Sequence, residues 1–407
     1  MDTHGEVRWA RIDDEEERAA RWGLWSIPGI GFRRFERLLS LCEGSCKSLW
    51  ALEVSERRRR FKAVGLGAGP MELIEGLFRG PVEECLNAEM ARAPAGVSIV
   101  HLGDENYPVR LMEIEAPPVF LSILGAPRVV TEARQVAIVG SRKARVEDVT
   151  FTERMAAELA DAGVIVVSGG ALGVDGAAHR GSLAARGGTS VVLPGGLGAL
   201  APGSHRGLFE RIAEEGGALI SEYPAQVKAR PYHFRRRNCL IAALADVVVV
   251  VRAEVKSGTM LTAEAARDLA RPLLVVPGAL DDPLAAGCLD LLVRGARAVR
   301  HGRDVLSVLS GETECGRRLS RAKSPRPMPE RSVSIAPVAP PGLDETTSGV
   351  FEKLVEFGRD GVDMVHIDEL AQSLKRPVAE LGRPLIELEL RGCVERVSGA
   401  SAYRLCH

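Results

Sequence analysis

Five short segments rich in glycine, serine and proline follow apolar, β-branched runs in the middle of the chain. They are Gly140-Ser141-Arg142, Ser168-Gly169-Gly170, Pro194-Gly195-Gly196, Ser257-Gly258-Thr259 and Pro277-Gly278. The first two come directly before helical patterns, and a helix N-terminus attracts anions through unpaired N–H groups and a partial positive charge. Glycine allows a backbone to approach a ligand closely. Five such segments at one edge of a sheet predict an anionic ligand there.

A second group of residues combines aromatic rings with cations. The segment PYHFRRRNCLIAAL places Tyr232 and Phe234 beside the run Arg235 to Arg237, just before an apolar helical pattern. Single-stranded nucleic acid is bound by this combination, because bases stack on rings and guanidinium groups take phosphates. Arginines at a helix N-terminus oppose the macrodipole, so helix stability explains them poorly. We therefore favour a nucleic-acid contact over the alternative that Phe234 is core and the arginines are a solvated helix start.

The turn VKSGTMLTA adds Lys256 beside another predicted helix N-terminus. The hydroxyl groups of Ser257 and Thr259 can cap that helix or bond a phosphate oxygen, and both roles are compatible. This turn therefore belongs to the same predicted anion site.

Cofactor and catalytic motifs are missing from these segments. Gly140 is followed by Ser-Arg-Lys-Ala-Arg, so the dinucleotide fingerprint G-x-G-x-x-G is absent, and no Walker motif is present. Asp175 and His179 lie four residues apart on one helical pattern, without further ligands at metal spacing. We expect the Asp175 carboxylate, in the first turn of its helix, to interact favourably with the helix dipole, and His179 to hydrogen-bond within the fold. No cofactor, metal or catalytic residue is predicted.

Composition places the chain among globular proteins of two to four domains. It has 407 residues, with 46% apolar and 26% charged residues and a net charge of −1, so phosphate affinity must come from local clusters. Eight cysteines are scattered without a CxxC motif, which indicates reduced thiols and a cytoplasmic location. Neither a signal-peptide pattern near Met1 nor an apolar run of membrane-spanning length is present, so no membrane partner is expected.

The central region predicts a doubly wound α/β domain. Continuous Val/Ile/Leu runs indicate strands buried on both faces of a parallel sheet. We expect these strands at 136–139, 164–167, 190–193, 218–220, 246–251 and 273–276, separated by helical segments. Residues 97–125 predict an added strand, turn, small helix and strand.

The two ends of the chain have different patterns. Residues 1–90 read as helical, and Pro28-Gly29-Ile30-Gly31 fits either a phosphate-binding helix-hairpin-helix turn or a plain bundle turn. Arg57 to Arg60 fits a solvated helix face. Residues 311–348 are rich in Pro, Arg and Ser and predict a flexible linker. Residues 349–407 predict three helices and a terminal strand pair around Val397 and Tyr403, as in a winged helix. We expect its wing and its recognition helix, about 377–391, to carry only modest positive charge, which weakens the case for duplex-DNA binding.

Seven motifs together resemble the DNA processing protein A (DprA/Smf) family over at least residues 97–305. They are VAIVGSRKAR, SGGALGVDGAAHRGSL, GALISEYP, HFRRRNCLI, KSGTMLTA, VVPG and GCLDLLVRGARAV. The resemblance implies an extended Rossmann-like domain at 97–310, between an N-terminal helical (helix-hairpin-helix or SAM-like) domain and a C-terminal winged helix. It also implies a dimer that binds single-stranded DNA entering the cell in natural transformation and helps load RecA recombinase onto it.

The resemblance also assigns roles to particular residues. Arg142, beside Ser141, would grip phosphate, and Phe234 would stack a base. Close backbone and hydroxyl contacts would come from Gly169, Gly170, Gly195, Ser257, Gly258 and Thr259. The pocket would be lined by Arg235, Arg237, Asn238 and Lys256. The dimer and RecA surfaces would lie around Leu289, Leu292, Val293 and Ala298.

Some positions depart from the family pattern. Arg235 and Cys239 replace a proline and an arginine, and Leu172 stands where a basic residue is common. The segments Pro194-Gly195-Gly196 and Ala201 to His205 replace G-S-G and Y-P-x-x-N. Two alternatives remain open. One is a nucleotide-processing enzyme of the phosphoribohydrolase type, whose P-G-G-x-G-T-x-x-E motif is only half present. The other is a duplex-DNA regulator acting through the winged helix.

Overall fold

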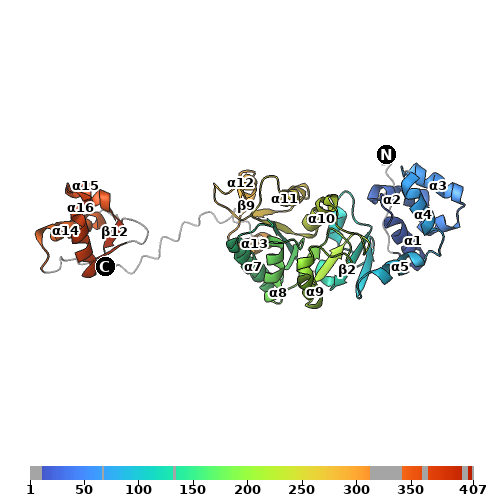
Figure 1. The fold of residues 1–407 in the computed structure, drawn as a ribbon, viewed down its shortest axis with the longest axis horizontal. Helices are drawn as coiled ribbons and strands as arrows, with labels where there is room; N and C mark the ends of the chain where they lie inside the picture. Colours follow the sequence, from blue (N-terminus) through green and yellow to red (C-terminus); the bar gives the residue numbers. More distant parts are fainter. Residues whose placement is uncertain are drawn as a thin grey trace. The chain divides into compact units, whose positions relative to one another are not determined.

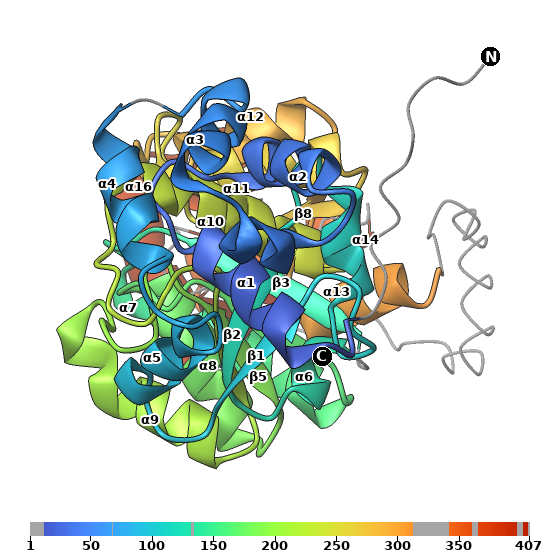
Figure 2. The same ribbon diagram turned by 90° about the vertical axis from the view of Figure 1, so that its right-hand side faces the viewer.

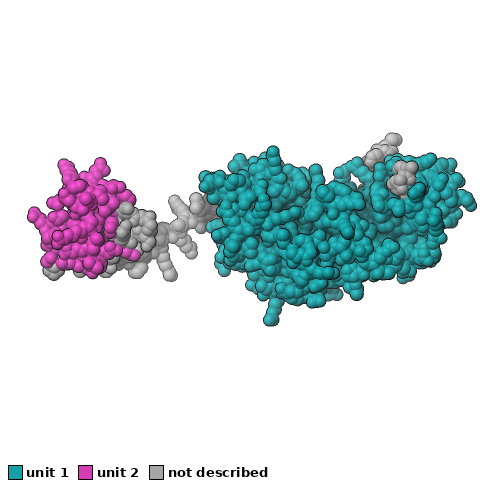
Figure 3. Space-filling view, viewed as in Figure 1, with its two compact units in different colours: residues 1–314 teal, residues 315–407 magenta. Residues whose placement is uncertain are grey.

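The computed structural model describes residues 12–66, 68–131, 134–311, 342–359, 365–396 and 402–405. Contacts divide the chain into two compact units, 1–314 and 315–407, which are coloured separately in Figure 3. Most of the predicted linker, 312–341, lies outside the described residues, as does Val397. No described helix combines the length and apolar character needed to cross a membrane.

The first unit is built on a nine-stranded sheet with the order β1-β2-β6-β5-β4-β3-β7-β8-β9. The six strands expected between 136 and 276 are all confirmed, with small shifts at their ends. They are β3 (Gln135–Gly140), β4 (Ile165–Ser168), β5 (Thr189–Val192), β6 (Ala218–Ser221), β7 (Val247–Val251) and β8 (Leu273–Val275). These strands and the short β9 (Arg297–Ala298) are parallel. The doubly wound α/β prediction is confirmed.

The predicted added unit extends this same sheet. β1 (Val97–His101) pairs antiparallel with β2 (Phe120–Gly125), and β2 pairs antiparallel with β6. A short 3-10 helix, η2 (Val109–Glu113), lies in the connection between β1 and β2. The sheet is therefore mixed at this edge, because β1 and β2 both enter it by antiparallel pairing.

Helices cover both faces of the sheet, which explains the unbroken apolar runs. Val136 and Ile138 of β3 pack with α7 (Val146–Asp161), α8 (Val174–Ala184) and α13 (Gly302–Leu309). Ala137 and Val139 pack on the other side with α10 (Pro231–Leu244), α11 (Gly258–Asp268) and α12 (Ala286–Val293). Figure 1 shows α7, α8 and α13 on one side of the sheet and α10 and α11 on the other. Successive side chains of a strand point to opposite faces, so both sets must be apolar.

The strand order reverses direction between β3 and β7. From β3 the chain moves outward through β4 and β5 to β6, and from β7 it moves the other way through β8 to β9. The loops that leave the carboxyl ends of β3 and β7 therefore diverge. Sheets of this kind bind their ligands in the crevice at this point.

The N-terminal helices share a core with the edge of the sheet. They are α1 (Glu15–Trp25), α2 (Phe32–Leu41), η1 (Cys46–Ala51), α3 (Val54–Ala63), α4 (Ala68–Leu77) and α5 (Glu84–Arg92). Trp22 packs edge-on against Phe120 of β2 with ring centroids 5.2 Å apart. The indole Nε1 of Trp25 donates to the Glu222 carbonyl at 3.3 Å. These contacts place the helical region and the sheet in one compact unit, and whether residues 1–90 form a domain by themselves stays a prediction.

The second unit has the fold of a winged helix. Its helices are α14 (Glu345–Arg359), α15 (Ile367–Leu374) and α16 (Val378–Leu390). Its small sheet has the order β10-β12-β11, formed by β10 (Val365–His366), β11 (Val394–Arg396) and β12 (Ala402–Leu405). The first helix begins at Glu345, a few residues before the predicted start at 349.

Candidate nucleic-acid interface

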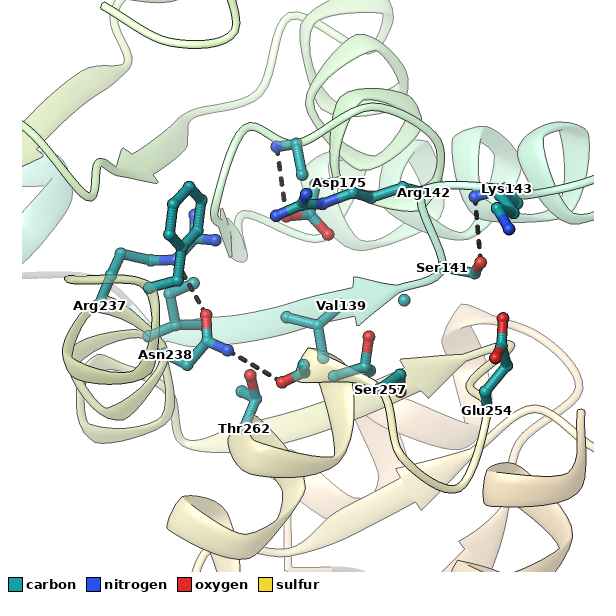
Figure 4. A pocket seen from close by; sticks show the side chains of 16 residues that line it. Val139, Ser141, Arg142, Lys143, Asp175, Arg237, Asn238, Glu254, Ser257 and Thr262 are labelled. Atoms are coloured by element: carbon teal, nitrogen blue, oxygen red, sulfur yellow. Dashed lines mark hydrogen bonds between the residues drawn. The ribbon is translucent and has the colours of Figure 1, made fainter. Parts of the chain in front are cut away.

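A cavity of about 360 Å³ lies at the point where the strand order reverses. It is bounded by the loop after β3, the start of α8, the first half of α10 and the start of α11 (Figure 4). Eight of the predicted contact residues line it. They are Ser141, Arg142, Phe234, Arg237, Asn238, Ser257, Gly258 and Thr259. Residues up to 118 positions apart in sequence, from Ser141 to Thr259, thus meet at one site.

The ring of Phe234 lies between two guanidinium groups. The Arg142 guanidinium carbon is 5.3 Å from the ring centroid, and that of Arg237 is 5.7 Å away. Both distances allow a cation–π attraction. Phe234 is half-buried and Arg142 is exposed. An aromatic ring and an exposed cation therefore meet at the mouth of the cavity, as the sequence predicted.

Arg237 is buried, and its guanidinium bonds to the protein itself. It donates to the carbonyl of Gly169 after β4, to the carbonyl of Val192 at the end of β5 at 3.2 Å, and to Asn238 Oδ1 at 2.9 Å. Burial lowers the pKa of Arg237, although the Asp175 carboxylate opposes this shift. Arg237 forms part of the cavity wall, but its donors satisfy strand carbonyls. Its main effect is to hold α10 against the sheet.

The other two arginines of the run have different surroundings. Arg236 donates to both carboxylate oxygens of Glu222, at 3.0 and 2.9 Å, and to the Ala116 carbonyl at 2.6 Å. Arg235 is exposed but does not line the cavity. The interpretation of the run as a set of phosphate contacts is therefore wrong for Arg236, which is held by a structural ion pair. The macrodipole argument disfavoured a role of these arginines in stability, but such a role explains both Arg236 and Arg237.

The N-terminus of α11 has the features of an anion-binding site. Asn238 Nδ2 donates to the Gly258 carbonyl at 2.9 Å and fixes this helix beside α10. Ser257 is the N-cap residue but its side chain makes no capping bond, and its buried Oγ has no hydrogen-bond partner among the described residues. This leaves the hydroxyl and the first N–H groups of α11 available to an anion at the cavity. Lys256 is exposed in the same loop and does not line the cavity.

The three predicted glycine contacts outside this loop have packing roles and do not line the cavity. The Gly169 carbonyl accepts from Arg237. Gly170 has a φ of +67°, and a Cβ atom there would lie 2.7 Å from the Phe209 ring. A Cβ atom at Gly195 would lie 2.8 Å from the Val227 carbonyl oxygen. The surroundings of these three glycines indicate close packing within the protein. They do not indicate direct contact with a ligand.

The turns after β5 and β8 are also outside the cavity. Gly196 donates its N–H to the Val227 carbonyl at 2.8 Å, so the Pro194-Gly195-Gly196 turn is covered by the 224–229 segment. A Cβ atom at Gly278 would lie 2.3 Å from Ala285. The expected row of five anion-binding turns therefore reduces to the turns after β3 and β7. The half-present phosphoribohydrolase motif is covered in the same way and does not open onto the cavity.

Three charged residues that the sequence interpretation did not assign to the site also line the cavity, namely Lys143, Asp175 and Glu254. Lys143 is exposed and its N–H donates to Ser141 Oγ at 3.0 Å. Asp175 is buried at the start of α8, where it accepts from the Ala171 N–H at 3.3 Å, and burial raises its pKa. The run Ser-Arg-Lys was a usable signal for Lys143. The sequence offered none for Glu254, which the loop after β7 brings to the rim.

His179 behaves as expected. Its Nδ1 lies 2.8 Å from Thr189 Oγ1, and burial lowers the pKa of His179 to about 3. His205, one of the departures from the family pattern, has its Nδ1 2.9 Å from the Gly170 carbonyl oxygen. Burial raises the pKa of the Cys239 thiol, and Leu172 is 46% exposed. No group of three or more metal-ligating side chains occurs among the described residues.

The predicted partner surface lies at the far edge of the sheet, on α12 and β9. Val293 is 88% exposed, Ala298 is exposed, and Leu289 and Leu292 are half-buried. An exposed apolar side chain at the edge of a sheet is compatible with an interface.

The chain matches known proteins over both units. The family model of DNA recombination-mediator protein A matches residues 98–310, and the DprA winged helix domain matches residues 334–400. A putative DNA processing protein DprA of Mycobacterium tuberculosis is 36% identical over 279 residues, which cover 68% of this chain and 67% of that protein. Protein Smf of Escherichia coli is 30% identical over 311 residues, covering 76% and 78%.

The fold agrees with these matches. The X-ray structure of DNA processing protein A from Streptococcus pneumoniae superimposes with a TM-score of 0.58 at 26% identity, covering 73% of this chain and 98% of that one. Sequence and fold lead to one conclusion: the chain belongs to the DNA recombination-mediator protein A (DprA/Smf) family, whose members are DNA-processing proteins.

Proposed function

We propose that the protein is a single-stranded DNA-binding recombination mediator. It would protect incoming DNA during natural transformation and help load RecA onto it, acting as a homodimer and without catalysis. The observation that carries this proposal is the pairing of Phe234 with the exposed Arg142 at the mouth of the cavity. A duplex hides its base faces, so a ring at the cavity mouth favours an unpaired strand.

The cavity supplies the two kinds of contact that an unpaired strand needs. A base stacks on Phe234, while the neighbouring phosphate meets Arg142, the Ser257 hydroxyl and the N–H groups at the start of α11. Stacking contributes roughly 1–3 kcal/mol per base. Arg237 and Asn238 act indirectly, because their bonds to strand carbonyls and to Gly258 fix the positions of α10 and α11.

The composition of the cavity wall supports binding without bond breaking. Its hydroxyl groups belong to Ser141, Ser257, Thr259 and Thr262, and no histidine lies among the lining residues to take a proton from them. Asp175 is occupied by the Ala171 N–H and sits at a helix N-terminus. Release of free base from a nucleoside monophosphate by the pure protein would contradict this part of the proposal.

The DNA test compares single-stranded and duplex oligonucleotides by fluorescence anisotropy over a salt series. Arg142→Ala should weaken single-strand binding and reduce the salt slope by about 0.7, the value for one phosphate that is no longer neutralised. Arg211→Ala is the matched control, because this exposed arginine of α9 (Arg206–Glu214) pairs with Glu215, and α9 leads into β6, three strands away from β3 in the sheet. Equal affinities for the two variants would show that the cavity is not the site.

The dimer and RecA parts rest on family membership and on the exposed Val293. Sedimentation should show a dimer for the wild-type protein and a monomer for Val293→Arg. The wild-type protein should also help RecA displace a single-strand binding protein from DNA. A monomeric wild-type protein that gives RecA no help would overturn both parts.

A further inference from the structure

The α2–α3 region of the first unit carries a strong excess of positive charge. Between residues 26 and 66 there are nine Lys or Arg side chains and four Glu side chains, in a chain whose net charge is −1. Six of these cations are exposed and form what we call the basic face. They are Arg33, Arg34, Arg37, Arg58, Arg59 and Lys62.

The fold brings the two halves of the basic face together. Arg37 Nη2 donates to the Ala63 carbonyl at 3.1 Å, and Arg60 Nη1 donates to the Leu41 carbonyl at 3.0 Å. These crossed bonds show that α2 and α3 run antiparallel and side by side. Figure 2 shows both helices at the end of the first unit that faces the viewer. The two helices that carry the cations of the basic face therefore lie next to each other.

The pairing of Arg33, Arg34 and Arg37 leaves them able to meet an external anion. Arg34 and Arg37 bond to backbone carbonyls, which hold the side chains without neutralising their charge. Arg33 pairs with Glu115, and both side chains are more than three-quarters exposed. A pair so exposed contributes little to stability and exchanges readily for another anion. Arg33 and Arg34 also lie in the first turn of α2, where cations oppose the macrodipole and so do not stabilise the helix through it.

The turn before α2 has the shape to join this surface. Gly29 has a φ of +93°, and the N-cap residue Gly31 has no side-chain cap. The first N–H groups of α2 thus have no capping side chain, next to Arg33 and Arg34. This geometry extends the basic face to the Pro28–Gly31 turn.

The aromatic residues of this region decide which nucleic acid fits. Trp22, Phe35 and Phe61 are buried, and Trp25, Phe32 and Trp50 are half-buried. The three half-buried rings pack against the core of the N-terminal helices, whereas the half-buried Phe234 lines the cavity. The cavity differs, because Tyr232 is 65% exposed near Phe234. Cations without rings recognise a phosphate backbone, which is densest on a duplex.

We propose that the basic face, together with the Pro28–Gly31 turn, is a second DNA-binding surface that holds the phosphate backbone of duplex DNA. It is separate from the cavity proposed for the single strand. A protein with both surfaces would bind next to a junction between duplex and single-stranded DNA.

The test uses the full chain with Arg33→Ala, Arg59→Ala and Lys62→Ala combined. All three side chains are exposed, and Arg33 and Arg59 pair with glutamate side chains, so their removal should leave the fold intact. Duplex affinity, measured by anisotropy over a salt series, should fall, with the salt slope reduced by about 0.9 for each phosphate that is no longer neutralised. Single-strand affinity should stay within about twofold, because phosphate binding at the cavity remains.

Two further variants make the test decisive. Arg180→Ala, Arg211→Ala and Arg303→Ala combined remove the same charge from other exposed positions and should leave duplex affinity unchanged. Arg33→Lys, Arg59→Lys and Lys62→Arg combined keep the charge and should keep duplex binding. The proposal is overturned if the alanine variant loses no more duplex affinity than the charge-matched control, or if it loses single-strand affinity equally. Arg142→Ala should leave duplex binding intact, so the two proposals fail separately.

Discussion

Two helices of this protein, α10 and α16, lie where DNA contacts were expected, and their surfaces are opposite in character. α10 begins at the cavity with the half-buried Phe234, beside the exposed Arg142. α16, the predicted recognition helix, exposes Ile386 at 56% and Leu390 at 84%. The winged-helix fold alone therefore does not imply DNA binding, because contact with phosphates depends on the side chains that the helix exposes.

The charge of the second unit also differs from that expected of a DNA-binding domain. Residues 377–391 contain three glutamates and two arginines, so the expected modest positive charge of the recognition helix is wrong. The described residues of the whole unit carry eight Lys or Arg side chains and ten Asp or Glu side chains. Like charge repels a phosphate backbone. The duplex-DNA regulator alternative loses support for this reason.

The largest effect expected from a substitution concerns the anchoring of α10. Arg237→Ala should lower the free energy of unfolding of the first unit by about 3 kcal/mol, because it leaves buried carbonyls at the ends of β4 and β5 without donors. Calorimetry should show an earlier transition. Arg383→Ala on the exposed face of α16 is the matched control and should cause no measurable change. A first-unit transition that does not move would mean that Arg237 does not anchor α10.

The next effect concerns the ring at the cavity. Phe234→Ala should weaken single-strand binding by roughly 1–3 kcal/mol, the value of one base stacked on a ring. Leu390→Ala removes an exposed apolar side chain from α16 and should not change this affinity. Anisotropy on a single-stranded oligonucleotide measures both. The contrast between the two helices breaks down if Leu390→Ala weakens binding as much as Phe234→Ala.

Low pH should destabilise the first unit through His179. The folded first unit holds His179 with its pKa lowered to about 3, whereas the unfolded chain takes up this proton below about pH 6.5. The stability of the unit therefore declines as the pH falls from about 6.5 towards 3, by up to about 1.4 kcal/mol per pH unit.

Calorimetry over this pH range, on the wild-type protein and on His179→Gln, measures the acid effect. The stability difference between wild type and variant should shrink as the pH falls, and only in the first-unit transition. A difference that is constant with pH would show that His179 is not held neutral by the fold.

The smallest expected effect is on duplex binding by the second unit. Arg383→Ala combined with Arg391→Ala removes both cations of the predicted recognition helix and should leave duplex affinity and its salt slope unchanged. A slope reduced by about 0.9 or more would restore the winged helix as a duplex-DNA contact.

Much of the fold and part of the site could be predicted from local sequence patterns. Strands such as β3 and β7 are apolar at every position because helices cover both faces, and this pattern is visible without coordinates. The turns after β3 and β7 carry glycine and hydroxyl groups, and their position at one edge followed from the predicted parallel sheet, whereas the adjacency of β3 and β7 came from the structure. The turn after β5 has the same composition, and only its cover by the 224–229 segment excludes it from the cavity.

The sequence by itself determined that a ring and cations meet at one edge of a parallel sheet, since composition, period and motif order are local properties of the chain. Only the tertiary structure decided what each arginine of the run 235–237 contacts. Successive residues of a helix point about 100° apart, so three neighbours enter three environments. Arg235 is exposed, Arg236 meets Glu222, and Arg237 reaches carbonyls of β5 and the turn after β4. The partners that fix these roles come from distant segments, which no local pattern identifies.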